Sequence, residues 1–186
     1  MLDARLGAGL LALALAVAAP TMTARPAVAA SAAEINRDVD QAIKLVVSQD
    51  PEARKLAAQA KAVLVFPSIV KAGFMFGAQY GDGAMRVKGK TVGYYNTVAA
   101  SYGLQAGVQT FGYALFFMTD SAVTYLSKSD GFELGTGPSI VVLDKGAAGA
   151  LSTSTVQKDI YAIIFDQKGL MAGLGLQGTK ISRIAR

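Results

Sequence analysis

The sequence predicts an α+β protein in which N-terminal helices pack on a strongly curved, barrel-like antiparallel β-sheet. Two observations carry this prediction. Apolar residues recur at helical spacing in the first part of the chain after residue 30, and from residue 62 onward they alternate with the period of two that a strand requires. Helical and strand patterns do not alternate regularly, which disfavours a parallel sheet built from β-α-β units.

Residues 1–29 have the features of a secretory signal peptide. Arg5 supplies a positive charge, an uncharged run rich in Leu and Ala follows, and Ala-Val-Ala at 27–29 offers a cleavage site. An uncleaved membrane anchor is the alternative, because residues 6–24 are uncharged and a span needs about 20 residues. Pro20 weakens that alternative. We therefore expect one domain at 30–186, periplasmic or secreted, and able to attach to a membrane peripherally.

Two helices are expected at the start of the mature chain. Ser31 and Glu34 have capping-box spacing, and the apolar residues that follow lie on one face, so a helix should run to about Ser48. Asp50 and Pro51 suit the N-cap and first turn of a second helix that ends near residue 61. The first helix has more acids than bases, which favours packing on the core over a membrane surface.

Strand patterns occupy most of the remaining chain. Pro67 should stop the first strand, residues 81–83 should form a turn, and Gly89 with Lys90 should form a second turn. A short helix should follow Asp120. The expected strands cover residues 62–66, 73–80, 84–88, 91–95, 99–109, 114–118, 139–143, 160–166 and 170–181.

Glycine and glutamine share one face of three expected strands, at 77–79, 103–109 and 173–177. Glycine within a strand costs stability unless something needs the space. Tight barrel-like coiling, or the close approach of another element, is the favoured explanation. A groove for an acyl chain is the functional alternative.

The composition and the short motifs disfavour catalysis. The chain has no Cys and no His, so it lacks thiolate metal sites, a Cys nucleophile and the commonest general base. Residues 173–178 fit G-x-G-x-x-G, but too few residues follow for a β-α-β unit. Ser68 and Lys71 fit S-x-x-K, but its companion motifs S-D-N and K-T-G do not occur. We expect no catalytic residues, no metal ion and no cofactor.

Positive charge is concentrated in one part of the mature chain. Without residues 1–29 it has sixteen bases and twelve acids, and the whole excess lies between positions 61 and 90. Arg86 and Lys88 should project to the same side of a strand, with Lys90 in the adjacent turn. This pattern suits an anion-binding patch for phosphate headgroups, although a strand edge protected by charge would look the same. The modest charge disfavours nucleic acid as a partner.

Residues 60–74, AKAVLVFPSIVKAGF, resemble the opening signature of the SYLF domain family, and the resemblance continues at 102–107, 115–118 and 169–174. The family implies a phospholipid-binding module that prefers phosphoinositides in eukaryotes, where some members, related to yeast actin-patch proteins, also bind actin. Bacterial relatives are typically exported single-domain proteins, so neither phosphoinositide nor actin is expected as a partner here. Lys71 is the signature-matched base that should contact a headgroup.

These observations predict an exported, non-catalytic domain that binds anionic phospholipids or a membrane surface. The expected lipid-binding residues are Lys71, Arg86, Lys88 and Lys90. The alternative is a structural or protein-interaction module of the cell envelope, in which the basic residues only guard a strand edge.

Overall fold

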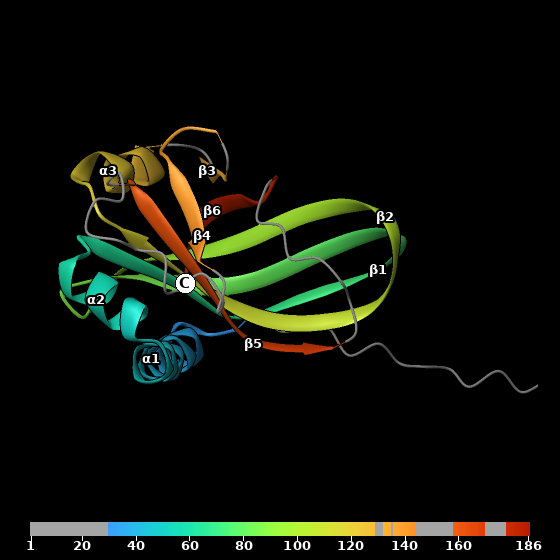
Figure 1. The fold of residues 1–186 in the computed structure, drawn as a ribbon, viewed down its shortest axis with the longest axis horizontal. Helices are drawn as coiled ribbons and strands as arrows, with labels where there is room; N and C mark the ends of the chain where they lie inside the picture. Colours follow the sequence, from blue (N-terminus) through green and yellow to red (C-terminus); the bar gives the residue numbers. More distant parts are fainter. Residues whose placement is uncertain (1–29, 129–131, 135, 144–157, 170–177) are drawn as a thin grey trace, which may run out of the picture.

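A computed structural model describes residues 30–128, 132–134, 136–143, 158–169 and 178–186 of the 186-residue chain (Figure 1). The expected signal peptide lies outside the described residues. The predicted α+β class, with N-terminal helices on a strongly curved sheet, is confirmed. The elements are α1 (Ala32–Gln49), α2 (Pro51–Gln59), β1 (Ala62–Val87), β2 (Lys90–Phe117), α3 (Asp120–Lys128), β3 (Phe132–Glu133), β4 (Ile140–Leu143), β5 (Ile160–Gly169) and β6 (Lys180–Ile184).

Helices α1 and α2 begin where their capping residues predict. The Ser31 hydroxyl accepts a hydrogen bond from the Glu34 N–H at 3.3 Å, and the Ser31 N–H donates to Glu34 Oε2 at 2.8 Å. The Asp50 carboxylate likewise accepts from the Glu52 N–H at 2.8 Å at the start of α2. These contacts satisfy backbone donors that an uncapped helix leaves without partners. The apolar face of α1 is buried against the sheet.

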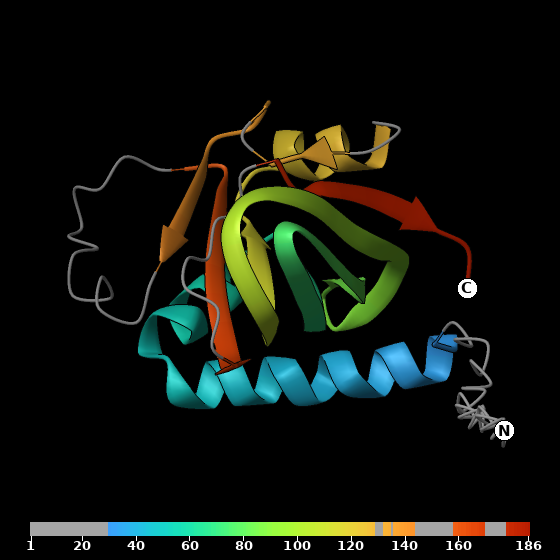
Figure 2. The same ribbon diagram turned by 90° about the vertical axis from the view of Figure 1, so that its right-hand side faces the viewer.

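Strands β1 and β2 form one long antiparallel ribbon that is folded back on itself, as Figure 2 shows. The ribbon pairs from Ala62 opposite Phe117 to Val87 opposite Lys90. The two residues between the strands, Lys88 and Gly89, have φ angles of 50° and 79°. Positive φ at both positions is the geometry of a type I′ turn, whose twist matches that of the flanking strands.

Two breaks predicted in β1 are wrong. Pro67 lies at a β-bulge, where the shifted register tolerates its missing N–H, so the strand continues past it. Residues 81–83 are not a turn, since each pairs with a residue of β2. The turn predicted at Gly89 and Lys90 is confirmed with a shift of one residue, to Lys88 and Gly89.

The glycines of β1 are required because the two halves of this strand pack directly against each other. A Cβ atom at Gly83 would lie 2.2 Å from the carbonyl oxygen of Val65, and one at Gly81 would lie 2.7 Å from Cγ1 of Ile69. Close approach is therefore the reason for glycine at these positions. Gly175 and the side-chain surroundings of Gly103 lie outside what the structure describes.

The ribbon turns back on itself at Gly73. A Cβ atom there would lie 2.4 Å from the Cα of Gly77, and the pairing register shifts nearby. We call residues 70–80 of β1 and 97–109 of β2 the folded end of the ribbon. We call residues 86–91, around the hairpin turn, the turn end. Figure 1 shows the two at opposite ends of the long axis of the molecule.

The remaining strands extend the sheet from the free edge of β2. Strand β6 pairs with residues 94–98 and β5 with residues 109–117, while β3 pairs with β6. Strand β4 pairs with β5 in the parallel direction, so the sheet is mixed and the expectation of a wholly antiparallel sheet is wrong at this pair. The chain between β4 and β5, residues 144–159, is long enough for the crossover that a parallel pair needs.

Asp159 connects three elements near the start of β5. Its carboxylate accepts hydrogen bonds from the Ser139 hydroxyl at 2.8 Å, the Ser139 N–H at 2.9 Å and the Thr119 hydroxyl at 3.0 Å. These donors favour the charged carboxylate, so they lower the pKa of Asp159, the Ser139 hydroxyl having the largest effect. The residue thus ties the segments before α3 and β4 to β5.

The sheet has a hydrophobic core on each face. Helices α1 and α2 cover the outer face, and α3 covers the inside of the curve (Figure 2). Alternate residues of β2 serve the two cores: Tyr113, Leu115 and Phe117 point inward, while Ala114 and Phe116 face α1 and α2. No helix among the described residues is long and apolar enough to cross a membrane.

Candidate anion-binding groove

A groove of about 520 Å³ lies between α1, α2 and the turn end of the ribbon. Four of its lining residues are bases and one is an acid; the rest of the wall is mostly alanine, isoleucine and valine. It therefore combines positive charge with an apolar surface. The lining residues are Asp40, Ile43, Lys44, Ala57, Ala58, Ala60, Lys61, Ala62, Val63, Arg86, Lys88 and Gly89.

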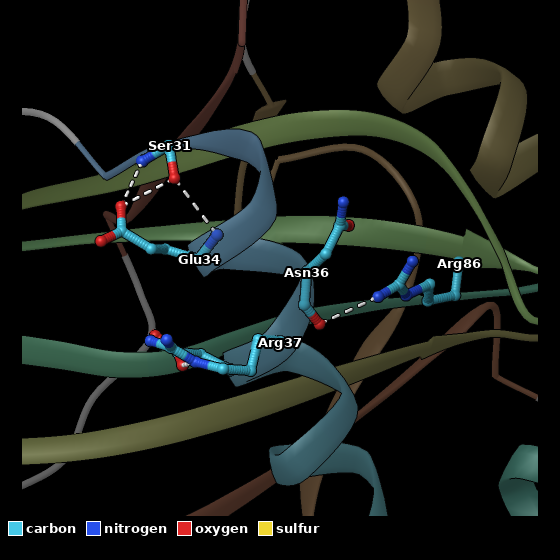
Figure 3. A network of polar contacts seen from close by, with 6 residues as sticks. Ser31, Glu34, Asn36, Arg37 and Arg86 are labelled. Atoms are coloured by element: carbon cyan, nitrogen blue, oxygen red, sulfur yellow. Dashed lines mark hydrogen bonds and ion pairs between the residues drawn. The ribbon is translucent and has the colours of Figure 1, made fainter.

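Arg86 holds α1 against the turn end. Its side chain is only 10% exposed, and its Nη2 donates to Asp40 Oδ1 at 2.7 Å. The same Nη2 donates to the Asn36 carbonyl oxygen at 3.1 Å (Figure 3). Its Nη1 donates to the Thr91 hydroxyl, which in turn donates to the Asn36 side chain at 2.7 Å. Asn36 completes the network by donating to the Tyr94 hydroxyl at 2.9 Å. The one acid of the groove is thus already paired.

Lys88 projects from the hairpin turn in a backbone conformation that lysine rarely adopts. Its φ of 50° is typical of glycine or asparagine, and placing another residue there costs about 1 kcal/mol. Lys88 and Lys90 are both exposed. The structure shows no ion pair for either lysine within the residues it describes.

Lys44 and Lys61 complete the groove from the helical side. Lys44 lies on α1 one turn after Asp40, and Lys61 lies between α2 and β1. The nearest acid to Lys61 is Asp120, whose Oδ2 is 4.0 Å from Nζ in a solvent-exposed pair. Such a pair contributes little, so Lys61 can turn toward an anion at small cost. Sequence reasoning did not place either lysine at the site, although Asp40 and Lys44 have the spacing of neighbours on a helix.

Residues 98–185 match the family described as "Ysc84: Las17-binding protein actin regulator". This match is consistent with the resemblance of the sequence to the SYLF domain family. The match contains residues 98–117 of β2 and all later elements, whereas the groove bases lie before it in the chain. A comparison with curated proteins finds no match. The bases of the groove therefore lie outside the segment that matches the family.

The structure brings three of the four predicted binding residues together. Arg86, Lys88 and Lys90 all lie at the turn end, and the first two line the groove. Lys71 lies far along β1, opposite Gln109, and is only 6% exposed. It points into the curved sheet and does not line the groove.

Lys71 belongs to a group of buried polar residues inside the folded end of the ribbon. Gln79 donates to the Thr179 hydroxyl at 3.3 Å, and Tyr113 donates to the Thr97 hydroxyl at 2.6 Å. Burial raises the pKa of Tyr113, which keeps its hydroxyl protonated. Among the described residues, no cluster of acids is placed to hold a metal ion.

Proposed function

We propose that this protein is an exported, non-catalytic domain that holds the anionic headgroup of a phospholipid in the groove at the turn end. Export is inferred from the signal-peptide pattern of residues 1–29, and the absence of catalysis from the lack of histidine and cysteine. The proposal depends on the groove, whose basic lining residues suit the headgroup of an anionic lipid and whose apolar lining residues suit its acyl chains.

The observation that carries the proposal is the excess of positive charge in the groove. Arg86 neutralises Asp40, so Lys44, Lys61 and Lys88 remain for an incoming anion. Each base close to an anionic membrane surface contributes on the order of 1 kcal/mol. Lysine ammonium groups on flexible stems act as mobile point charges, which suits phosphate without specifying one headgroup.

The apolar part of the groove favours a lipid over free phosphate. Ile43 of α1 and Val63 of β1 lie beside the bases. Burial of apolar surface contributes roughly 25 cal/mol per Å², so glycerol and the first methylenes of an acyl chain would add affinity that inorganic phosphate cannot gain.

Vesicle sedimentation tests the proposal. The mature protein should bind phosphatidylglycerol-containing vesicles in preference to pure phosphatidylcholine vesicles. Binding should be weaker at about 0.5 M than at about 0.1 M salt, because the screening length is about 10 Å at 0.1 M and becomes shorter as salt is added. Lys44→Glu with Lys88→Glu should weaken binding at least about tenfold. Arg86 is left intact, because a glutamate there would face Asp40 and disturb α1.

The matched control is Arg37→Glu with Lys128→Glu, which changes the net charge equally at two exposed residues outside the groove. Equal weakening by both pairs would show that only overall charge matters and would overturn the groove as the site. Millimolar phosphate and a short-chain phosphatidylglycerol can each be added as competitors for vesicle binding. If phosphate displaces the protein as effectively as the lipid does, the groove would be assigned to a free anion.

A protein-binding role is the second candidate, because the family description names a protein partner and actin. For this chain the partner would be a protein of the cell envelope. Failure to bind vesicles of any composition would favour it.

A further inference from the structure

The folded end has the opposite polarity to the rest of the sheet. Of the eight large apolar side chains that the described part of the chain leaves exposed, five lie there, with Phe76 69% and Val108 60% exposed. The buried side chains that the structure describes at the same end are polar. The exposed set is Val70, Phe76, Tyr80, Val98 and Val108, and the buried polar set is Lys71, Gln79, Thr97 and Gln109.

This alternation identifies the kind of surface that the folded end fits. A strand with one face in water places polar residues outside and apolar residues inside. Strands whose outer face meets lipid show the reverse pattern, apolar outside and polar inside.

The ribbon carries no free charge on this surface. Residues 72–81 and 91–119 contain no charged residue. The first acid beyond the folded end on β1, Asp82, pairs with Arg186 at 2.8 Å, and both side chains are largely buried. The Tyr80 hydroxyl also donates to Asp82 at 2.6 Å, which leaves an aromatic ring at the edge of the apolar surface. Tyrosine with an apolar body and a polar tip is enriched where membrane meets water.

Bases flank the folded end where it joins the body. Strand β6, which pairs beside Val98, carries Lys180 and Arg183 and no acid. Lys168 of β5 pairs beside Thr110, where it forms an exposed ion pair with Asp166, and Glu133 of β3 lies opposite Lys180. Basic residues at the border of an apolar surface complement lipid phosphates.

We propose that the folded end of the ribbon docks onto a lipid bilayer, with Phe76 and Val108 entering the boundary between headgroups and acyl chains. This surface is separate from the groove, because the two lie at opposite ends of the molecule (Figure 1). One flat bilayer therefore cannot contact both. Docking through the folded end depends on the burial of apolar side chains, whereas binding in the groove depends on charge. High salt and uncharged lipids should therefore weaken binding in the groove but not docking through the folded end.

The chain has no tryptophan, which allows a single reporter to be introduced. Phe76→Trp places it on the folded end, and Tyr125→Trp places a control at a half-exposed position of α3. With phosphatidylcholine vesicles at about 0.5 M salt, where exposed charges are strongly screened, tryptophan emission should shift to shorter wavelength and be quenched by brominated acyl chains in the first variant only.

A loss-of-contact variant gives the second readout. Phe76→Ser with Val108→Ser should weaken partition into phosphatidylcholine vesicles at least about tenfold, since both side chains lose apolar surface to bury. The matched control, Val92→Ser with Val142→Ser, removes two exposed valines elsewhere and should leave partition unchanged. Because all four side chains are exposed, circular dichroism should show both variants folded.

The outcomes separate this surface from the groove. Binding to anionic vesicles at low salt without any change in the emission of the Phe76→Trp variant would overturn the folded end and leave the groove proposal intact. No binding to any vesicle would overturn both. An emission shift in the Phe76→Trp variant that depends on protein concentration without vesicles would assign the surface to a second copy of the chain and overturn lipid docking.

Discussion

The turn end and the folded end belong to the same pair of strands but are built in opposite ways. At the turn end, basic side chains gather, and a polar network holds helix α1 in place. At the folded end, the large exposed side chains that the structure describes are apolar, and polar groups are buried. One antiparallel ribbon can thus present two chemically different surfaces, because they lie at its two ends. The inner face of the ribbon is apolar along one part of its length and, in the residues described, polar at the folded end.

The largest effect should come from blocking the contact between the halves of β1. Gly83→Val would place a Cβ 2.2 Å from the Val65 carbonyl oxygen and 2.7 Å from the Phe66 ring, and the added methyl groups need still more room. We expect a loss of about 3 kcal/mol or more in the free energy of unfolding. Urea denaturation measures it. Gly89→Ala, at an open position of the turn, is the comparison and should cost about 1 kcal/mol because its φ is positive. Equal urea midpoints for the two variants would contradict the close contact between the two halves of β1.

At the turn end, Arg86→Met should cost about 2 kcal/mol. It removes hydrogen bonds to Asp40, Asn36 and Thr91 from a largely buried site. Asp40→Asn should cost less, since Asp40 is more than half exposed and solvent weakens its share of the pair. Urea midpoints for both variants check this order, and a larger effect from Asp40→Asn would mean that the ion pair alone holds α1.

Inside the folded end, Gln109→Met should raise the free energy of unfolding by about 1 kcal/mol. The side-chain oxygen of Gln109 is buried without a hydrogen-bond partner within the described structure, so an apolar side chain of similar size should be better tolerated. Gln79→Met is the control, because it removes the hydrogen bond to Thr179 and should not stabilise. Destabilisation by Gln109→Met would show that the polar interior contributes to stability.

Outside the ribbon, Asp159 should make stability depend on pH. Its pKa is lowered below 3.8 in the folded state, so its contribution is present above that value and is lost as pH falls through the lowered pKa. The drop in urea midpoint between about pH 6 and about pH 3 should therefore be smaller in Asp159→Asn than in the wild type. An identical drop in the urea midpoint of the variant and the wild type would show that groups other than Asp159 cause the acid sensitivity.

The smallest effect concerns the turn itself. Lys88→Asn should stabilise the fold by about 0.5–1 kcal/mol, because asparagine tolerates the positive φ of that position. The same change removes a groove base, so vesicle binding should fall while the thermal midpoint rises. A fall in both vesicle binding and the thermal midpoint would show that Lys88 supports the fold.

The sequence predicted the helices better than the strands, for physical reasons. Capping residues act locally, and Ser31 and Asp50 mark the true starts of α1 and α2. The sequence predicts breaks at Pro67 and at residues 81–83, but both segments continue the strand. The reason is a bulge at Pro67 and a contact between distant parts of β1 at residues 81–83, neither of which follows from local sequence.

The candidate site was predictable only where its residues lie close together in the chain. The two-residue spacing of Arg86 and Lys88 placed both at the turn end. Lys44 and Lys61 reach the groove from other elements, which requires the packing of α1 on the sheet. The buried position of Lys71 was missed because alternation along a strand does not say which face is inside.

The two-residue turn at Lys88 and Gly89 also sets an order of events during folding. It brings the ends of β1 and β2 together with almost no loop to close, so pairing can begin there and spread along the ribbon on the microsecond scale of hairpin formation. Strand β6 joins β2 only across a long stretch of intervening chain, which is a slower search. Helix α1 can complete its hydrogen bonds to the turn end only once Arg86 and Thr91 stand side by side, although it is the first part of the domain to leave the ribosome.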